Sequence, residues 1–123
     1  MIAINTSKGD RVIAANVVWA GTSAERRKGL LGRTTMSPDD GMYITPCECV
    51  HTFAMKFPID IAFLDKNGRI LRIQRALKPY RISRLVWQAD GVLELAAGRL
   101  AETGTEVGDT IAFKDDAGEE PVS

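Results

Sequence analysis

Short runs of apolar and β-branched residues, separated by turn residues, dominate the hydrophobic pattern of this chain. Runs of this length and composition predict strands rather than long helices. We expect strands at 11–20, 41–45, 50–57, 59–65, 69–77, 84–87, 92–97 and 107–114. The run IDIAFLD at 59–65 is almost wholly apolar, which is typical of a strand buried on both faces.

Turn and capping residues between the runs define the connections. Asn67-Gly68 separates two apolar runs and predicts a hairpin. Thr22-Ser23-Ala24-Glu25 fits a capping box and predicts a helix that ends near Gly32, and 98–104 fits one helical turn. The pattern therefore predicts a mainly β fold: a single-domain β-sandwich or partly closed barrel, over residues 1–114, with one or two short helices. Residues 115–123 form an acidic, flexible tail in this interpretation.

Composition narrows the class of protein. The 123 residues suit one domain, which can bury roughly two thirds of its unfolded surface without a metal or a disulfide. Sixteen basic and 16 acidic residues give no net charge, which argues against a nucleic-acid footprint over the whole surface and leaves local patches open. No run approaches the roughly 18 residues of a membrane span. We expect a cytoplasmic chain, or an envelope protein if a leader has been removed.

Cys47, Cys49 and His51 lie close together in the sequence and raise the question of a metal or redox site. In an extended segment, Cys47 and His51 would lie about 13 Å apart, which is too far to share one ion. The chain has no further Cys or His to complete a zinc site. A disulfide between Cys47 and Cys49 would be strained and easily reduced. We therefore predict neither a metal nor a cofactor.

Basic residues recur every three positions in the second half of the chain: Arg69, Arg72, Arg75, Lys78, Arg81 and Arg84. In a strand these side chains alternate between opposite faces, so they do not form one stripe. We interpret the run as a solvated strand, partly at a sheet edge, whose arginines discourage pairing with another chain. The alternative is a phosphate or carboxylate site built from Arg81, Arg84 and a neighbouring residue, because the planar guanidinium binds such groups through two hydrogen bonds.

Two carboxylates occur in apolar surroundings. Asp60 begins a strand that we expect to be buried, and Glu94 lies between Leu93 and Leu95. A buried carboxylate must be paired, protonated or hydrogen-bonded. Asp60 is either a cap for backbone N–H groups or part of a site, and Glu94 either faces solvent, pairs with an arginine or joins that site. His51 is likewise either a hydrogen-bonded structural residue or part of a strand face that opens into a cleft.

Several segments in a fixed order resemble a known family. They are ERRKGLLGR, GMYI, HTFAMKFPIDIAFLDKNGRI, VLELAAG and a late Gly-Asp pair, spread over residues 17–113. Together they resemble the domain of unknown function 192 family. The matching positions are Gly29, Leu30, Arg33, Gly41, Met42, Met55, Pro58, Asp60, Glu94, Gly98, Gly108 and Asp109. The resemblance implies a compact, mainly β domain and no established activity.

We predict a small domain that binds a ligand or a protein partner without chemistry. Its candidate surface consists of His51, Met55, Asp60, Arg81 and Glu94. The alternative is a small hydrolase that uses His51 with a carboxylate, which requires the two groups to lie about 3 Å apart or one water apart beside an open pocket. A third option is an accessory module that acts through an exposed apolar patch.

Overall fold

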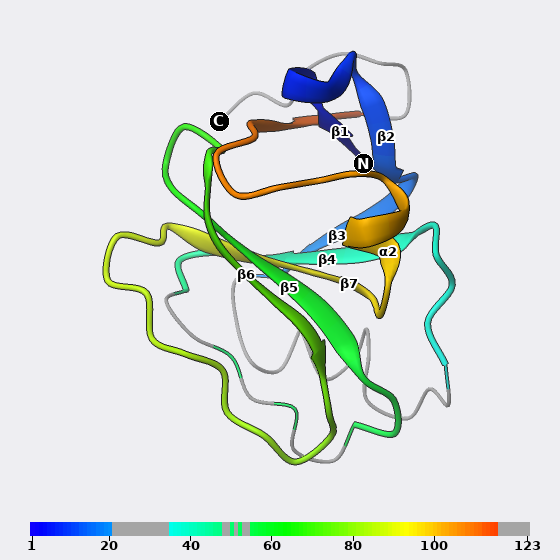
Figure 1. The fold of residues 1–123 in the computed structure, drawn as a ribbon, viewed down its shortest axis with the longest axis vertical. Helices are drawn as coiled ribbons and strands as arrows, with labels where there is room; N and C mark the ends of the chain where they lie inside the picture. Colours follow the sequence, from blue (N-terminus) through cyan, green and yellow to red (C-terminus); the bar gives the residue numbers. More distant parts are fainter. Residues whose placement is uncertain (21–34, 48–49, 51, 53–54, 116–123) are drawn as a thin grey trace.

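Eight strands and two short helical elements make up the described part of the chain. The structure is a computed structural model and describes residues 1–20, 35–47, 50, 52 and 55–115. In chain order the elements are β1 (Ile2–Asn5), the 3-10 helix η1 (Thr6–Lys8), β2 (Arg11–Ala14), β3 (Asn16–Ala20), β4 (Asp40–Ile44), β5 (Ile59–Leu64), β6 (Ile70–Leu77), β7 (Gly91–Ala96), α2 (Arg99–Glu102) and β8 (Ile111–Lys114). The prediction of a mainly β domain with short helices is confirmed (Figure 1).

The strands form two sheets. One has three strands in the order β2-β1-β8, and the other has five in the order β3-β4-β7-β5-β6. Figure 1 shows the three-stranded sheet packed at one side of the five-stranded sheet, as in a β-sandwich rather than a closed barrel. All neighbouring strands are antiparallel except β3 and β4, which are parallel. A parallel pair requires a long crossover, here the residues between Ala20 and Asp40.

Apolar clusters cover both faces of the five-stranded sheet. Between the sheets, β1, β2 and β8 contribute Ala3, Ile13 and Ile111 to a cluster with Leu64 and Leu93. The opposite face carries a second cluster, which includes Ile61, Phe63 and Val92 of the sheet together with Val50, Met55 and Ala89 of the connecting loops. Every residue of β5 and of β7 is therefore buried. The prediction of a central strand at 59–65 is confirmed, because a strand covered on both faces is mainly apolar at successive positions, with Asp60 as the exception in β5.

The predicted hairpin joins β5 to β6. The Asp65 carboxylate accepts hydrogen bonds from the backbone N–H groups of Asn67 (2.8 Å) and Arg69 (3.0 Å) and holds the turn. Gly68 has φ +84°, and a Cβ at this position would overlap the carbonyl of Ile111 in β8. The glycine thus allows the hairpin of one sheet to touch the edge of the other.

Three expected strands differ from the structure. The single strand expected at 11–20 is two strands in different sheets, because the chain bends at Ala15 between β2 and β3. The strands expected at 50–57 and 84–87 are wrong in the described residues, which form connecting loops there. Their apolar residues reflect packing of the loops onto the sheet, as Val50 and Val86 show. Strand β1 was not expected at all.

Other expectations agree with the structure or fall outside it. β6 is an edge strand of its sheet, and Arg72 and Arg75 on it are exposed, as predicted for a solvated edge. The helical turn expected at 98–104 is α2. The helix expected from Thr22 to Gly32 and most of the expected tail lie outside the described residues.

Candidate functional site

Both carboxylate oxygens of Asp60 are hydrogen-bonded inside the fold. Asp60 is completely buried, and the two oxygens accept hydrogen bonds from three backbone N–H groups: Ala76 (2.8 Å), Gly98 (3.0 Å) and Leu100 (3.2 Å). Ala76 and Gly98 both have positive φ, at an irregularity of β6 and at the start of α2. Asp60 therefore caps backbone N–H groups, which is one of the two alternatives from the sequence, and the groups that it caps belong to β6 and to the start of α2.

Glu94 and Asp60 lie on opposite faces of the five-stranded sheet. Glu94 of β7 pairs with Ile61 of β5, whose side chain belongs to the cluster beneath the loops. Asp60 pairs with Leu95, whose side chain belongs to the cluster between the sheets. Directly paired residues of neighbouring strands share a face, and adjacent residues alternate. The structure thus does not bring these two carboxylates together.

The remaining members of the predicted surface lie on the loop-covered side or outside the described residues. Met55 is buried in the same cluster that Ile61 joins, and Arg81 is exposed on the loop between β6 and β7. His51 lies outside the described residues, as does Cys49, while Cys47 is half-buried and packs against the cluster. Among the described residues no group of three or more His, Cys, Asp or Glu side chains is arranged to hold a metal ion. The surface around His51 stays a prediction.

Thr52 fastens the loop that carries Arg81. Its hydroxyl donates to the carbonyl of Lys78 (2.6 Å) and accepts from the N–H of Arg81 (2.9 Å). Its own N–H donates to the Arg81 carbonyl (2.8 Å), and its carbonyl accepts from the N–H of Tyr80 (2.9 Å). Thr52 is fully buried, so these bonds satisfy polar groups that have no access to water.

A cleft of about 480 Å³ opens between the two sheets, beside the β5–β6 hairpin. This volume falls in the range of sites that hold small ligands. Its lining combines aromatic rings, two carboxylates and hydroxyl groups. The residues are Trp19, Tyr43, Thr45, Asp65, Lys66, Asn67, Gly68, Asp90, Thr110, Ile111, Ala112 and Phe113.

Three aromatic rings form one wall of the cleft. Trp19 of β3 meets Tyr43 of β4 edge-to-face, with ring centroids 5.1 Å apart. Phe113 of β8 meets Trp19 at 5.4 Å and Tyr43 at 4.7 Å. Trp19 and Tyr43 are directly paired across the parallel strands, and Phe113 comes from the other sheet. The aromatic wall therefore joins the two sheets, and Trp19 keeps 42% of its surface exposed.

Carboxylates and a tyrosine hydroxyl form the polar side of the cleft. Burial raises the pKa of Tyr43 to about 12, and the negative charge of Asp90 acts in the same direction. The Tyr43 phenol is therefore neutral at physiological pH and can donate a hydrogen bond. Thr45 Oγ1 lies 3.0 Å from the carbonyl of Asp90 and 3.3 Å from its carboxylate. A Cβ at Gly91 would overlap the Tyr43 ring, so only glycine leaves room for the hydroxyl here.

Sequence reasoning missed this cleft. The three rings belong to strands distant in the chain, and only the register of β3 on β4 and the packing of β8 bring them together. The one available signal was the aromatic residue Trp19 in a strand otherwise rich in Val and Ala. Asp65 was assigned only to the end of the strand expected at 59–65, and Asp90 was not considered as part of a site.

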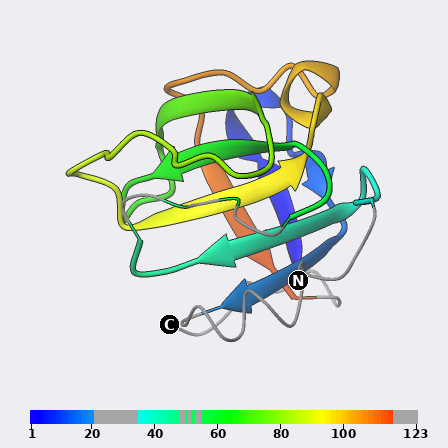
Figure 2. The same cartoon turned by 90° about the horizontal axis from the view of Figure 1, so that it is seen from below.

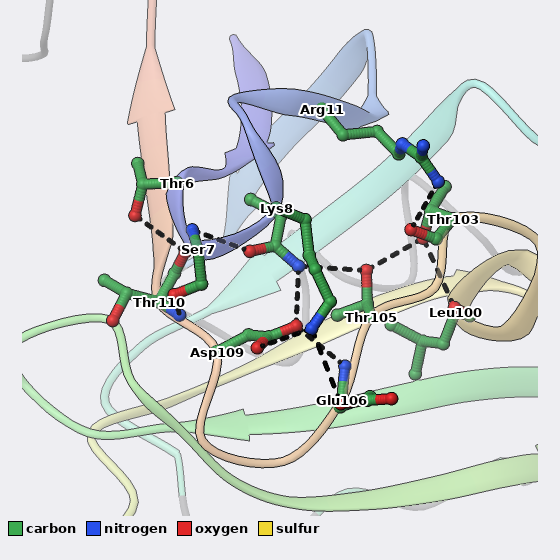
Figure 3. Close-up of polar contacts among 11 residues, drawn as sticks. Thr6, Ser7, Lys8, Arg11, Leu100, Thr103, Thr105, Glu106, Asp109 and Thr110 are labelled. Carbon is green, nitrogen blue, oxygen red and sulfur yellow. Dashed lines mark hydrogen bonds and ion pairs between the residues drawn. The ribbon is translucent and has the colours of Figure 1, made fainter.

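A buried polar network ties η1 to the loop that precedes β8 (Figure 3). Asp109 accepts hydrogen bonds from Asn5 Nδ2 (2.9 Å), the N–H of Glu106 (3.0 Å) and Lys8 Nζ (3.2 Å). Burial alone would raise the pKa of Asp109, but these three donors together hold it below its usual range. The hydrogen bond to Asp109 in turn raises the pKa of Lys8. Asn5 and Asp109 are buried, and the exposed Lys8 joins them through its ion pair with Asp109, so we assign the network a structural role.

Within the described residues, no helix has the length and apolar character needed to cross a membrane.

Comparison with known proteins identifies relatives over nearly the whole chain. The family model DUF192, described as "Uncharacterized ACR, COG1430", matches residues 3–113. A crystal structure of a protein of unknown function from Novosphingobium aromaticivorans DSM 12444 superposes with a TM-score of 0.77 at 26% identity, and the match covers 91% of this chain and 83% of that one. A crystal structure from Sinorhizobium meliloti 1021, described as a "putative transcription regulator", gives 0.72 at 28% identity and covers 89% and 88%. No curated protein matches the sequence.

Proposed function

Because the chain belongs to the DUF192 family, whose description names no activity, we propose its function from the cleft: a small domain that binds a ligand between its two sheets. The observation that carries the proposal is the lining of the cleft. Three rings that contact one another stand beside two carboxylates and hydroxyl groups. Ligand sites typically combine an apolar wall with a few polar groups that fix orientation.

The polar lining indicates the chemistry of the ligand. Ionised carboxylates such as Asp90 only accept hydrogen bonds, so a ligand must offer donors to them. Amines and hydroxyl compounds provide such donors, and a cationic amine would also be attracted to the face of an aromatic ring such as Trp19. Carboxylate ligands would meet like charges at Asp65 and Asp90, against the single positive charge of Lys66 in the lining. We therefore propose a small amine or polyol with an apolar body.

A thermal-shift screen tests the proposal with the intact chain. Amines, polyols and carboxylates are compared for their effect on Tm, since a ligand that binds only the folded state raises it. We expect stabilisation by members of the first two groups. Replacing an aromatic wall residue (Trp19→Ala) or a carboxylate (Asp90→Asn) should abolish the shift.

Matched controls come from the same chain. Trp87→Ala removes the other tryptophan, and Asp39→Asn removes an exposed carboxylate outside the cleft. Both variants should keep the ligand-induced shift. If either control variant loses the ligand-induced shift while Trp19→Ala keeps it, the ligand binds elsewhere and the proposal is wrong. Stabilisation by carboxylates alone would also overturn the proposal.

A role as a small hydrolase that uses His51 with a carboxylate stays a prediction. Among the carboxylates considered for that role, Glu94 lies on the loop-covered side of the sheet and Asp60 lies on the other. Asp60 already accepts hydrogen bonds from three backbone N–H groups, so any such site would use Glu94 rather than Asp60. The binding proposal does not depend on His51.

A further inference from the structure

Positive charge is concentrated in one stretch of this neutral chain. Residues 66–89 contain seven Lys or Arg residues and no Asp or Glu, which leaves nine basic against 16 acidic residues in the rest of the chain. The stretch thus carries a formal charge of +7 and the rest a charge of −7. All seven side chains are exposed: Lys66, Arg69, Arg72, Arg75, Lys78, Arg81 and Arg84.

Exposed apolar residues interleave with the last of these cations. We call residues 78–88, between β6 and β7, the basic-apolar loop. Within it Trp87 is 76% exposed, Ile82 65%, Tyr80 64% and Leu85 53%. Half of the large exposed apolar side chains found in the described residues lie in this one loop. A cluster of exposed apolar side chains of this kind typically marks a surface that contacts another molecule.

Hydrogen bonds and apolar packing hold the loop against the domain in a conformation that leaves these side chains exposed to solvent. Its backbone bonds to Thr52 at Tyr80 and Arg81, and the N–H of Ser83 donates to the carbonyl of Val50 (2.8 Å). Ser83 is buried, and Val86 packs against the apolar cluster beneath the loop. Ile82, Leu85 and Trp87, which alternate with these anchored positions, are exposed. Figure 2 shows the loop, in yellow-green, projecting from the body of the domain.

We propose that the basic-apolar loop docks the protein onto an anionic lipid surface. A projecting loop can insert Ile82, Leu85 and Trp87 among lipid chains, and Trp is favoured at the membrane interface. The arginines and lysines beside them attract anionic headgroups. A single-stranded nucleic acid would use the same cations and could stack bases on Tyr80 and Trp87. The exposed aliphatic side chains of Ile82 and Leu85 offer it no stacking surface, whereas lipid chains can cover them. The mixture of aliphatic and cationic side chains therefore favours lipid.

Co-sedimentation of the full chain with vesicles tests this inference. We compare vesicles of phosphatidylcholine alone with vesicles that also contain phosphatidylglycerol. Binding is expected only to the anionic vesicles and should weaken at high salt, because screening shortens the range of the attraction. Arg84→Glu changes the charge by two units and should weaken binding about 25-fold, at about fivefold for each unit of charge. The double variant Leu85→Ala/Trp87→Ala should weaken it about tenfold through lost apolar burial.

Matched variants outside the loop distinguish an effect of the loop from a general effect of net charge or of surface hydrophobicity. Lys114→Glu makes the same charge change in β8, and Val107→Ala trims another exposed apolar residue. Both should bind vesicles within twofold of the wild type, roughly the scatter expected for surface changes. Far-ultraviolet circular dichroism checks that every variant folds. The inference is overturned if Lys114→Glu and Arg84→Glu weaken vesicle binding equally. It is also overturned if the protein does not bind vesicles, or binds an oligonucleotide in place of vesicles.

Discussion

At the scale of single residues, Asp60 links three parts of the fold. One oxygen accepts from Ala76 in β6, and the other accepts from Gly98 and Leu100 where β7 leads into α2. Asp60 and Leu100 are fully buried, whereas Ala76 and Gly98 are exposed, so water can compensate for only part of the loss of these bonds. A buried N–H that loses its only acceptor costs about 1–3 kcal/mol.

We predict that Asp60→Ala destabilises the protein by about 2 kcal/mol or more, since the buried N–H of Leu100 and the partly buried N–H groups of Ala76 and Gly98 lose an acceptor. Urea unfolding at neutral pH measures the change. Asp39→Ala, at an exposed position, should stay within about 0.5 kcal/mol of the wild type. If Asp60→Ala loses no more stability than Asp39→Ala, the three hydrogen bonds do not stabilise the fold.

The sequence predicted the alternatives for Asp60 but could not choose between them. A carboxylate before a buried strand signals a polar partner, yet the partners here lie 16 to 40 residues away along the chain. The opposite orientations of Asp60 and Glu94 follow from the register of β5 on β7. Register depends on tertiary packing, so the five-residue surface could not be checked from the sequence.

At the scale of elements, Thr52 connects two loops that pack onto the five-stranded sheet without belonging to it. Its hydroxyl bonds to both ends of the short segment from Lys78 to Arg81. The same loop carries the exposed apolar residues Ile82, Leu85 and Trp87. Thr52 thus sets the position of the basic-apolar loop without belonging to it.

We predict that Thr52→Val, which keeps the shape but removes the hydroxyl, lowers stability by about 1–3 kcal/mol and accelerates amide exchange at Arg81. Thr52→Ser retains the hydroxyl and serves as the matched control, with Arg81 exchange near the wild-type rate. Hydrogen exchange followed by nuclear magnetic resonance resolves the single amide. Unchanged exchange in Thr52→Val would mean that the backbone bonds alone hold the loop.

The network that joins η1 to the loop before β8 predicts a dependence of stability on pH. The pKa of Asp109 is lowered in the folded state, so the unfolded chain takes up its proton first as the pH falls. The stabilisation is complete above the usual pKa of about 3.8 and disappears as the pH drops through the lower folded value. We expect Asp109→Asn to reduce the acid-side loss of stability, whereas Asp39→Asn keeps the wild-type profile.

Urea midpoints between neutral pH and the acid limit of folding measure this effect. The wild type should lose stability more steeply below about pH 4 than Asp109→Asn does. Parallel curves for the two proteins would contradict the role given to Asp109.

The elements that the sequence predicted correctly are those with a local signal. Asn67-Gly68 defines its hairpin through turn chemistry, and the almost wholly apolar run at 59–65 marks a doubly covered strand. The segments 50–57 and 84–87 are apolar for a different reason. They close over the sheet as loops and bury Val50, Met55 and Ala89 or half-bury Val86. Apolar content alone does not distinguish such loops from strands.

At the scale of the whole molecule, two sheets of unequal width create the cleft. The three-stranded sheet covers only part of the five-stranded one, and at its β8 edge the rings of Trp19, Tyr43 and Phe113 meet. The fold class followed from the spacing of strands and turns. The cleft did not, because it depends on which strands pair, and the parallel β3–β4 pair in particular places Trp19 beside Tyr43.

A crystal structure of the chain with the amine or polyol that raises Tm most is the most direct test of ligand binding in the cleft. We predict that the ligand lies against Trp19 and Phe113 and donates a hydrogen bond to Asp90 or Asp65. A ligand seated beneath the loops beside Met55 and Glu94, or bound outside both sheets, would contradict this account.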